Sequence, residues 1–242
     1  MHNKSIAGRI AVVAGMAALM AGMAWAGAGH ESAMSPDTAL EKLMEGNKRY
    51  VENKMTGEKL CDITARTALA KSQKPYAIIL SCSDSRVPPE LIFDKGLGEV
   101  FVVRVAGNVP DPVVLGSIEY AAEHLGSPLI MVLGHERCGA VKATVESKGK
   151  STGSANIDAI VKTVAPAVKI AAKDCAACKG EAKCAESKKD DFLECVSDTN
   201  AKRVAANLPG KSKIIKHLLE SKKIAIVAAK YDLDDGVVTL FK

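Results

Sequence analysis

Residues 129–138 have the sequence Leu-Ile-Met-Val-Leu-Gly-His-Glu-Arg-Cys, in which a short apolar run ends in a glycine, a histidine and then a cysteine. An apolar run of this length, bounded by turn-forming residues, is typical of a strand buried on both faces. Residues 76–80 form a second such run, which leads into Cys82-Ser83-Asp84-Ser85-Arg86. The sequence therefore places chemically reactive side chains just beyond two predicted strands.

The chain around these two strands alternates between strand and helix patterns. Further strands are predicted at residues 100–105 and 224–229, and residues 113–125 have the apolar spacing of a helix. Such alternation favours a parallel sheet with helices on its faces. The predicted fold class is therefore α/β, with a central, mainly parallel sheet flanked by helices. Residues 237–241 are expected to form a closing strand or hairpin partner.

The first residues have the pattern of an export signal. Lys4 and Arg9 accompany an apolar stretch over residues 10–23, and Ala24-Trp25-Ala26 fits a cleavage site. The stretch is short for a membrane-spanning helix. We therefore expect residues 1–26 to be a signal peptide and residues 27–242 to be a single domain, periplasmic or secreted, without stable membrane insertion. An uncleaved membrane anchor is the alternative.

The charge balance argues against a nucleic-acid partner. The formal net charge is +5, and cleavage of the signal peptide would remove Lys4 and Arg9. The remaining basic residues are interspersed with acidic ones, whereas nucleic-acid binding requires a concentrated basic surface. We therefore expect no nucleic-acid partner.

The side chains beyond the two buried strands form a candidate zinc site. Cys82, His135 and Cys138 offer two thiolates and one imidazole, a ligand set that suits zinc. Ligand sites of parallel sheets form at the carboxyl ends of strands, where these residues are expected to meet. A fourth position filled by water, or by Asp84, would make the site catalytic in type. Arg86 would hold Asp84 ionised and away from the metal. The pair would then act as a gate that controls access to the fourth ligand position.

The cysteines leave alternatives open. Cys82 and Cys138 could instead form a disulfide in an oxidising compartment. Four other cysteines lie in a polar stretch at about residues 173–198 that loses apolar periodicity. We expect this stretch to be a disulfide-stapled insert, with a second zinc or iron–sulfur site as the alternative. The pairing is undetermined among Cys61, Cys175, Cys178, Cys184 and Cys195.

Three motifs together resemble those of the β-class carbonic anhydrases. They are Cys82-Ser83-Asp84-Ser85-Arg86-Val87, Phe101-Val102-Val103-Arg104-Val105-Ala106-Gly107-Asn108 and Gly134-His135-Glu136-Arg137-Cys138-Gly139-Ala140-Val141. The resemblance extends from about Ser35 to the end of the chain. It is specific because the metal-ligand residues, the Asp–Arg pair and the strands that lead into them recur together in one order along the chain. It implies zinc-dependent, reversible hydration of carbon dioxide to bicarbonate and a proton. It also implies a homodimer, or a higher even oligomer, with sites at the subunit interface.

The resemblance also implies a substrate pocket. Gln73 matches a substrate-facing glutamine ahead of the first zinc cysteine, and Phe101, Ala106 and Tyr120 match a mostly apolar wall suited to uncharged carbon dioxide. One subgroup of the family closes its site with the aspartate on zinc and stores bicarbonate beside a tryptophan, but Ile79 stands at that position here. We therefore expect the open, water-ligated form.

Two other functions remain compatible with the sequence. Hydrolysis of carbonyl sulfide or carbon disulfide could occur on the same scaffold, because these linear, apolar substrates are attacked at the same carbon. A catalytically silent metal-binding protein is the second alternative. The presence of Asp84, Arg86 and Gln73 argues against the latter, because a protein that only holds a metal needs neither a gate nor a substrate amide.

Overall fold

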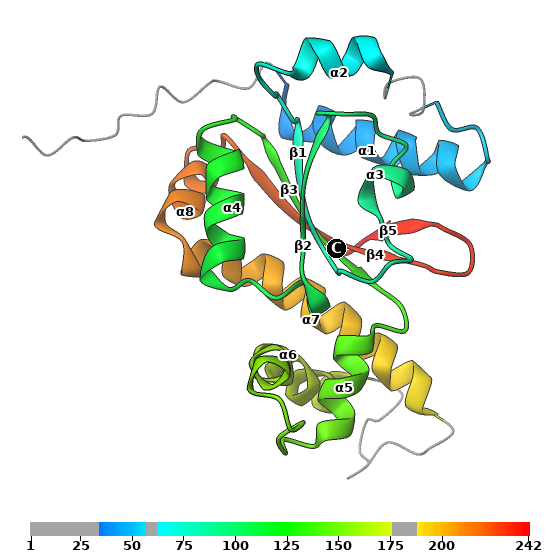
Figure 1. Cartoon of the computed structure of the whole chain (residues 1–242). Helices are drawn as coiled ribbons and strands as arrows, with labels where there is room; N and C mark the ends of the chain where they lie inside the picture. The colour runs from blue at the N-terminus through cyan, green and yellow to red at the C-terminus, as the bar shows by residue number, and fades with distance from the viewer. Residues whose placement is uncertain (1–33, 57–61, 176–187) are drawn as a thin grey trace, which may run out of the picture.

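The computed structural model describes residues 34–56, 62–175 and 188–242 (Figure 1). Within these residues the core is one sheet with the strand order β2-β1-β3-β4-β5. Its strands are β1 (Ala77–Ser81), β2 (Val100–Arg104), β3 (Leu129–His135), β4 (Ala225–Tyr231) and β5 (Val238–Leu240). Strands β1 to β4 are parallel, and β5 pairs with β4 in the antiparallel sense. The predicted fold class and the closing strand are thereby confirmed.

Helices cover both faces of the sheet. In chain order they are α1 (Pro36–Val51), α2 (Ile63–Leu69), α3 (Pro89–Ile92), α4 (Pro112–Glu123), α5 (Gly139–Ser147), α6 (Ala155–Asp174), α7 (Lys189–Lys211) and α8 (Lys213–Glu220). Helices α1 and α3 lie on one side of the sheet and α4 and α8 on the other, while α5 and α6 lie together beyond one end of the strands (Figure 1). A short 3-10 turn, η2 (Ala106–Asn108), follows β2.

Local sequence explains where several helices begin. Ser35, Asp62, Asp111 and Ser154 each precede a helix, and each side chain accepts a hydrogen bond from the backbone N–H three residues later. These caps satisfy N–H groups that have no partner inside the helix. The first turns of α1, α3 and α4 also contain proline, whose missing N–H is not needed there.

Alternate residues along the central strands belong to two separate cores. Ile79 and Met131 lie in the core that α1, α3 and α6 help to form, whereas Ile78, Leu80 and Ile130 lie in the core beneath α4, α7 and α8. Every residue of β1 and of β3 is buried. Strands covered on both faces are apolar throughout, which explains why the two apolar runs predicted their positions.

The structure differs from the sequence prediction in the cysteine-rich stretch. The sequence predicts a polar, Cys-rich insert without apolar periodicity at about residues 173–198, but α6 continues to Asp174 and α7 begins at Lys189. Phe192 and Val196 are buried one helical turn apart in α7, although charged neighbours obscure this spacing in the sequence. Residues 189–198 therefore form a regular helix, and the prediction of a disulfide-stapled insert stays a prediction. The proposed signal peptide, Cys61, Cys178 and Cys184 lie outside the described residues.

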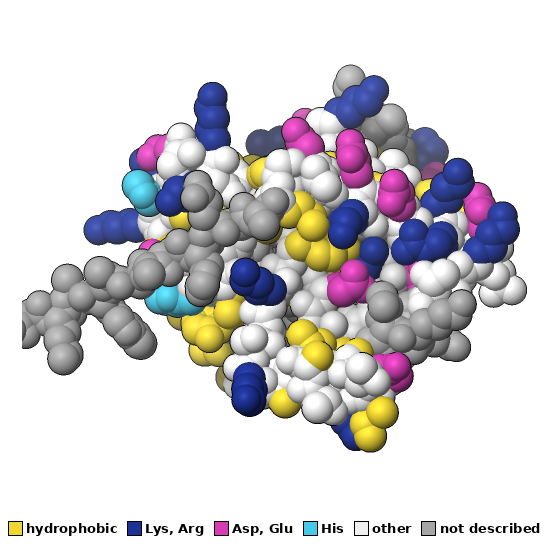
Figure 2. Space-filling view, turned by 90° about the horizontal axis from the view of Figure 1, so that it is seen from above, with side chains coloured by type: hydrophobic (Ala, Val, Ile, Leu, Met, Phe, Trp, Pro, Cys, Tyr) yellow, Lys and Arg dark blue, Asp and Glu magenta, His cyan; other side chains and the backbone are white. Residues whose placement is uncertain are grey.

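Charged side chains of both signs are mixed on the end of the molecule that carries α1 and α2 (Figure 2). Over the whole sequence, 33 Lys and Arg residues stand against 28 Asp and Glu residues, so that the two signs of charge are nearly balanced. Among the described helices, none combines the length and the hydrophobicity that crossing a bilayer requires.

Candidate metal centre

Three metal-binding side chains meet beyond the carboxyl ends of β1 and β3. Cys82 follows β1 directly, His135 is the last residue of β3, and Cys138 precedes α5 as its N-cap. Their two Sγ atoms and one ring nitrogen all lie within 4.8 Å of one another. All three residues are buried, with 4%, 1% and 5% of their surface exposed, respectively. The parallel pairing of β1 with β3 causes this meeting, because it brings both strand ends to one edge of the sheet.

The imidazole of His135 is oriented as a ligand. Its Nδ1 lies 2.7 Å from the carbonyl oxygen of Glu136, so that Nδ1–H donates to this oxygen and Nε2 keeps its lone pair. Nε2 is buried and has no hydrogen-bond partner among the described residues. An unsatisfied buried polar atom costs about 1–3 kcal/mol. A metal ion bound at Nε2 would remove this penalty.

The thiols of Cys82 and Cys138 interact with each other. A hydrogen bond from Cys138 lowers the pKa of Cys82 to about 4, and the backbone N–H of Gly107, 3.4 Å from Cys82 Sγ, adds to this shift. The hydrogen bond to Cys82 and burial both raise the pKa of Cys138. A thiolate is the form of cysteine that binds metals. The pocket therefore already stabilises negative charge on one of the two sulfur atoms.

Gly107 reaches Cys82 because its backbone lies in the left-handed region. Its φ is +70°, and a Cβ at this position would lie 3.0 Å from Cβ of Ala140 and 3.3 Å from Cγ2 of Val164. The amide of Asn200 donates to the carbonyl oxygen of Gly107 at 3.0 Å and so ties the turn to α7. Nothing in the sequence pointed to Asn200, because a contact between residues so distant in the chain leaves no local pattern.

Asp84 and Arg86 form the predicted bidentate pair. Nε and Nη2 of Arg86 donate to Oδ1 and Oδ2 of Asp84 at 2.9 and 2.8 Å, and the backbone N–H of Arg86 donates to Oδ1 at 3.0 Å. The hydrogen bonds from Arg86 hold the pKa of Asp84 well below its usual range. Asp84 does not belong to the group of ligand atoms that lie within 4.8 Å of one another. Its ionised carboxylate is thus held by Arg86.

Arg104 fixes the backbone between Cys82 and Asp84. This residue ends β2 directly opposite Ser81 of β1. Its Nε donates to the carbonyl oxygen of Cys82 at 2.9 Å, and its Nη2 donates to that of Asp84 at 2.5 Å. The sequence places Arg104 in one of the family-like motifs, but only the structure identifies it as the residue that positions both side chains.

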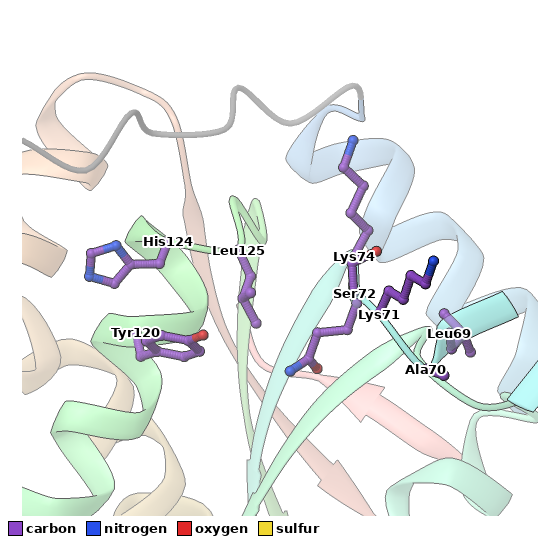
Figure 3. Close-up of a pocket in the computed structure, with 9 residues that line it drawn as sticks. Leu69, Ala70, Lys71, Ser72, Lys74, Tyr120, His124 and Leu125 are labelled. Carbon is purple, nitrogen blue, oxygen red and sulfur yellow. The ribbon is translucent and has the colours of Figure 1, made fainter. Parts of the chain in front are cut away.

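The four residues predicted to bind substrate do not lie together within one chain. Ala106 begins η2 beyond the carboxyl end of β2, whereas Phe101 lies near the amino end of β2, opposite Ile78 of β1. Gln73 and Tyr120 instead line a hollow of about 780 Å³ at the amino end of β1, opposite to the end that Cys82 follows. Figure 3 shows Tyr120 on α4 facing the segment of residues 69–74 across this hollow. Within one chain, this hollow is separate from the metal-ligand group.

Comparisons with known proteins identify the family. The carbonic anhydrase family profile matches residues 77–238. The sequence is 39% identical over 207 residues to carbonic anhydrase 2 of Mycobacterium tuberculosis, covering 85% of this chain and 93% of that protein. The structure of a Coccomyxa β-carbonic anhydrase in complex with acetazolamide aligns with a TM-score of 0.63 at 26% identity, over 84% of this chain and 86% of that one. The chain belongs to the β-class carbonic anhydrases.

The fold recurs in more distant β-carbonic anhydrases. One of two tetrameric enzymes from Sordaria macrospora aligns with a TM-score of 0.64 at 19% identity, over 84% of this chain and 96% of that one. Enzymes of this family hydrate carbon dioxide and typically use zinc, so that this β-carbonic anhydrase is an enzyme of carbon dioxide hydration. None of these findings favours the hydrolase or the catalytically silent protein that the sequence left open.

Proposed function

We propose that this carbonic anhydrase hydrates carbon dioxide with a zinc ion held by Cys82 Sγ, His135 Nε2 and Cys138 Sγ. Two observations carry the proposal. The buried Nε2 atom of His135 lacks a partner among the described residues, and a ring nitrogen of His135 lies within 4.8 Å of both cysteine sulfurs. Two thiolates and an imidazole suit zinc and leave one position for water. When bound, zinc lowers the pKa of such a water to about 7, which makes a nucleophile available at neutral pH.

Asp84 and Arg86 would orient the reacting water. The double hydrogen bond from Arg86 keeps Asp84 ionised, and an ionised carboxylate accepts hydrogen bonds but cannot donate them. Asp84 would therefore accept the O–H of the water and turn an oxygen lone pair toward the substrate carbon. While Arg86 holds both carboxylate oxygens, Asp84 also leaves the fourth ligand position accessible. This arrangement supports the open form of the site.

A second copy of the chain would complete the substrate pocket. Gln73 and Tyr120 lie at the far end of β1 from the ligands, so that they could reach a metal centre only in a partner. Strand β2 is an outer strand of the sheet. Helices α3 and α4 both contact it, and they expose Leu91 and Val113 by 53% and 79%, respectively. We therefore propose a homodimer, or a higher even oligomer, that covers this edge.

Pairing two defective variants tests this arrangement. Cys82→Ser should lose its metal, and Gln73→Ala should lose the substrate amide. In a mixed dimer, the metal centre of the Gln73→Ala chain would face the intact Gln73 of the other chain, so that one complete site forms. We expect the co-expressed mixture to be more active than either variant alone. Absence of this gain, or a monomeric mass by light scattering, would contradict the shared pocket.

Stopped-flow measurement of carbon dioxide hydration tests the function itself. A strong chelator should abolish the catalysed rate, and zinc should restore it. The same preparation supplied with carbonyl sulfide should turn over far more slowly. Faster hydrolysis of carbonyl sulfide would favour the hydrolase, whereas a zinc-loaded protein without hydration activity would favour the silent metal-binding protein.

We also propose that the protein is exported to the periplasm or secreted. The charged start, apolar stretch and small-residue site over residues 1–26 support this location. Trp25 is the only tryptophan in the chain, so that cleavage after Ala26 would remove all tryptophan fluorescence. Intact-mass analysis of the extracytoplasmic protein should give a chain that begins at Gly27. Retention of Trp25 in that protein would indicate an uncleaved anchor.

A further inference from the structure

A second pair of cysteines lies where α6 and α7 contact each other. Along α6, the buried residues Val164, Ala167 and Ala171 lie on one face at helical spacing, and Cys175 follows four residues later as the C-cap. The backbone N–H of Cys175 donates to the carbonyl oxygen of Ala171 at 2.8 Å. Only 8% of Cys175 is exposed. Cys175 therefore continues the buried face of α6.

Cys195 approaches Cys175 from α7. It lies in the second turn of that helix beside the buried Val196, and it packs against the core that also contains Ala171. Burial and a hydrogen bond with the Cys175 thiol raise the pKa of Cys195 to about 12. Helices α6 and α7 pack against each other, so that both cysteines lie at the same helix interface. Both cysteines are free thiols in the structure, so that a disulfide requires their Sγ atoms to move within bonding distance.

The surroundings of this pair do not complete a metal site. In the part of the chain that the structure describes, neither Cys175 nor Cys195 belongs to a group of three metal-ligating side chains. Two thiols at one helix interface that have no third ligand are suited to covalent pairing.

We propose that Cys175 and Cys195 form a disulfide bond that ties the end of α6 to the second turn of α7. The new bond joins the two Sγ atoms, which together release two protons and two electrons. An external disulfide of the glutathione class accepts them and is reduced to two thiols by thiol–disulfide exchange. The oxidising compartment that the export proposal implies would maintain the bond.

The disulfide would hold the first turns of α7 beside the metal centre. Leu193 and Glu194 of α7 line a hollow of about 550 Å³ together with Cys138, one of the three proposed zinc ligands. Cys195 follows these two residues directly, so that the bond anchors one wall of the hollow. Reduction would release this wall without removing a metal ligand.

Peptide mapping of the full mature chain tests the pairing. The protein is equilibrated with oxidised and reduced glutathione, alkylated, digested with trypsin and analysed without reduction. Trypsin releases Cys175 together with Cys178 in the peptide of residues 174–179, and Cys195 in that of residues 190–202. We expect these two peptides to be joined.

Fragmentation of the joined peptides between Ala176 and Ala177 assigns the bond to one of the two candidate cysteines. A link from Cys195 to Cys178 would overturn the proposal. So would a link from Cys195 to Cys184, or free Cys175 and Cys195 thiols in the oxidised protein. A Cys178→Ser variant should still give the joined peptides.

Thermal unfolding gives a second readout. The phosphine reductant TCEP should lower the Tm of the wild-type protein by about 6 °C, because the bond restricts the unfolded chain between residues 175 and 195. The double variant Cys175→Ser/Cys195→Ser should show no such shift, whereas the matched Cys178→Ser/Cys184→Ser variant should keep it. Zinc content measured before and after reduction shows that metal loss is not the cause. An equal shift in both double variants would overturn the proposal.

Discussion

Cys82 and Cys138 lie beyond the ends of two buried strands, whereas Cys175 and Cys195 lie between two helices. In each pair, burial and the partner thiol raise the pKa of one cysteine, Cys138 in the first pair and Cys195 in the second. The first pair differs because its other thiol, Cys82, has a pKa lowered by its partner thiol, by His135 and by a backbone N–H. The neighbours of each pair, and not the cysteines themselves, therefore favour a metal centre for the first pair and the proposed disulfide for the second.

The position of each cysteine pair in the fold explains why only the first pair has a third ligand nearby. The edge of a parallel sheet gathers several strand ends and loops, so that His135 and the Asp84–Arg86 pair can join two cysteines in one small volume. A contact between two helices brings together only the residues of two facing surfaces. It can supply a pair of thiols, but it supplies no third ligand for Cys175 and Cys195 among the described residues.

Removing the third ligand, His135, should leave Cys82 and Cys138 without zinc and free to form a disulfide, the state that we propose for Cys175 and Cys195. His135→Ala leaves only two protein ligands, which are too few to retain zinc. We expect zinc to fall from one per chain to nearly none, and carbon dioxide hydration to fall on the order of 10³-fold or more. In oxidising buffer, Cys82 and Cys138 should then become linked. Metal analysis, stopped-flow kinetics and unreduced peptide mapping measure the three effects.

His217 provides a matched control for this substitution. It is an exposed histidine on α8, so that His217→Ala should keep zinc, activity and free Cys82 and Cys138 thiols. Full hydration activity of metal-free His135→Ala would refute the role of the third ligand.

Removing the charged partner of Asp84 should lower activity while leaving the metal in place. Arg86→Ala frees both carboxylate oxygens of Asp84, which could then occupy the fourth ligand position. We expect a loss of about 10–100-fold in hydration rate, as is usual for residues that orient metal ligands. Arg86→Lys keeps the charge but cannot form the double hydrogen bond, so that it should recover only part of the rate. Unchanged hydration rates in both zinc-loaded variants would show that the Asp84–Arg86 pair does not control access to the fourth ligand position.

The sequence predicts the sheet and the ligand residues because both depend on short stretches of sequence, namely the apolar runs and the residues that directly follow them. Residues 129–133 are apolar because both faces of β3 are buried, and the reactive residues follow directly. The contact of Cys175 with Cys195 could not be predicted, because it depends on how α6 and α7 pack. The predicted strand over residues 76–80 already separates Gln73 from Cys82, whereas the position of Tyr120 in the same hollow as Gln73 depends on how α4 packs.

Gly107 links the two regions, because its N–H contacts Cys82 while a Cβ would meet Val164 of α6. Gly107→Ala should lower the free energy of unfolding by about 2–4 kcal/mol through left-handed strain and overpacking, and it should weaken zinc binding. Gly153 provides the control. Its φ is +87°, but a Cβ there would meet no atom of the described residues within 4 Å. Gly153→Ala should therefore lower the free energy of unfolding by only about 1–2 kcal/mol. Urea unfolding and zinc competition measure both effects. Equal losses in both variants would show that the contact with α6 is unimportant.

The smallest expected effect concerns Asp198, which lies one helical turn after Cys195 in α7. Burial raises its pKa to about 6 from an ordinary value of 3.8, although the charge of Lys230 opposes this shift. One carboxylate oxygen of Asp198 is buried and has no hydrogen-bond partner among the described residues. The surroundings of the second cysteine pair therefore disfavour negative charge on Asp198 as well as on Cys195.

The sign of the pH dependence follows from this raised pKa. Below about pH 4 both the folded and the unfolded chain carry the proton, so that Asp198 contributes no difference. Between about pH 4 and pH 6 the unfolded chain loses the proton first, and stability falls as the pH rises. Asp198→Asn should therefore stabilise the fold by about 1 kcal/mol near neutral pH, after allowance for solvent screening, and by less in acid. Urea unfolding of both proteins across this range measures the difference, with the exposed Asp191→Asn as control. A variant that is less stable than the wild type at neutral pH would show that attraction to Lys230 outweighs burial, and that the helix interface tolerates charge as the metal centre does.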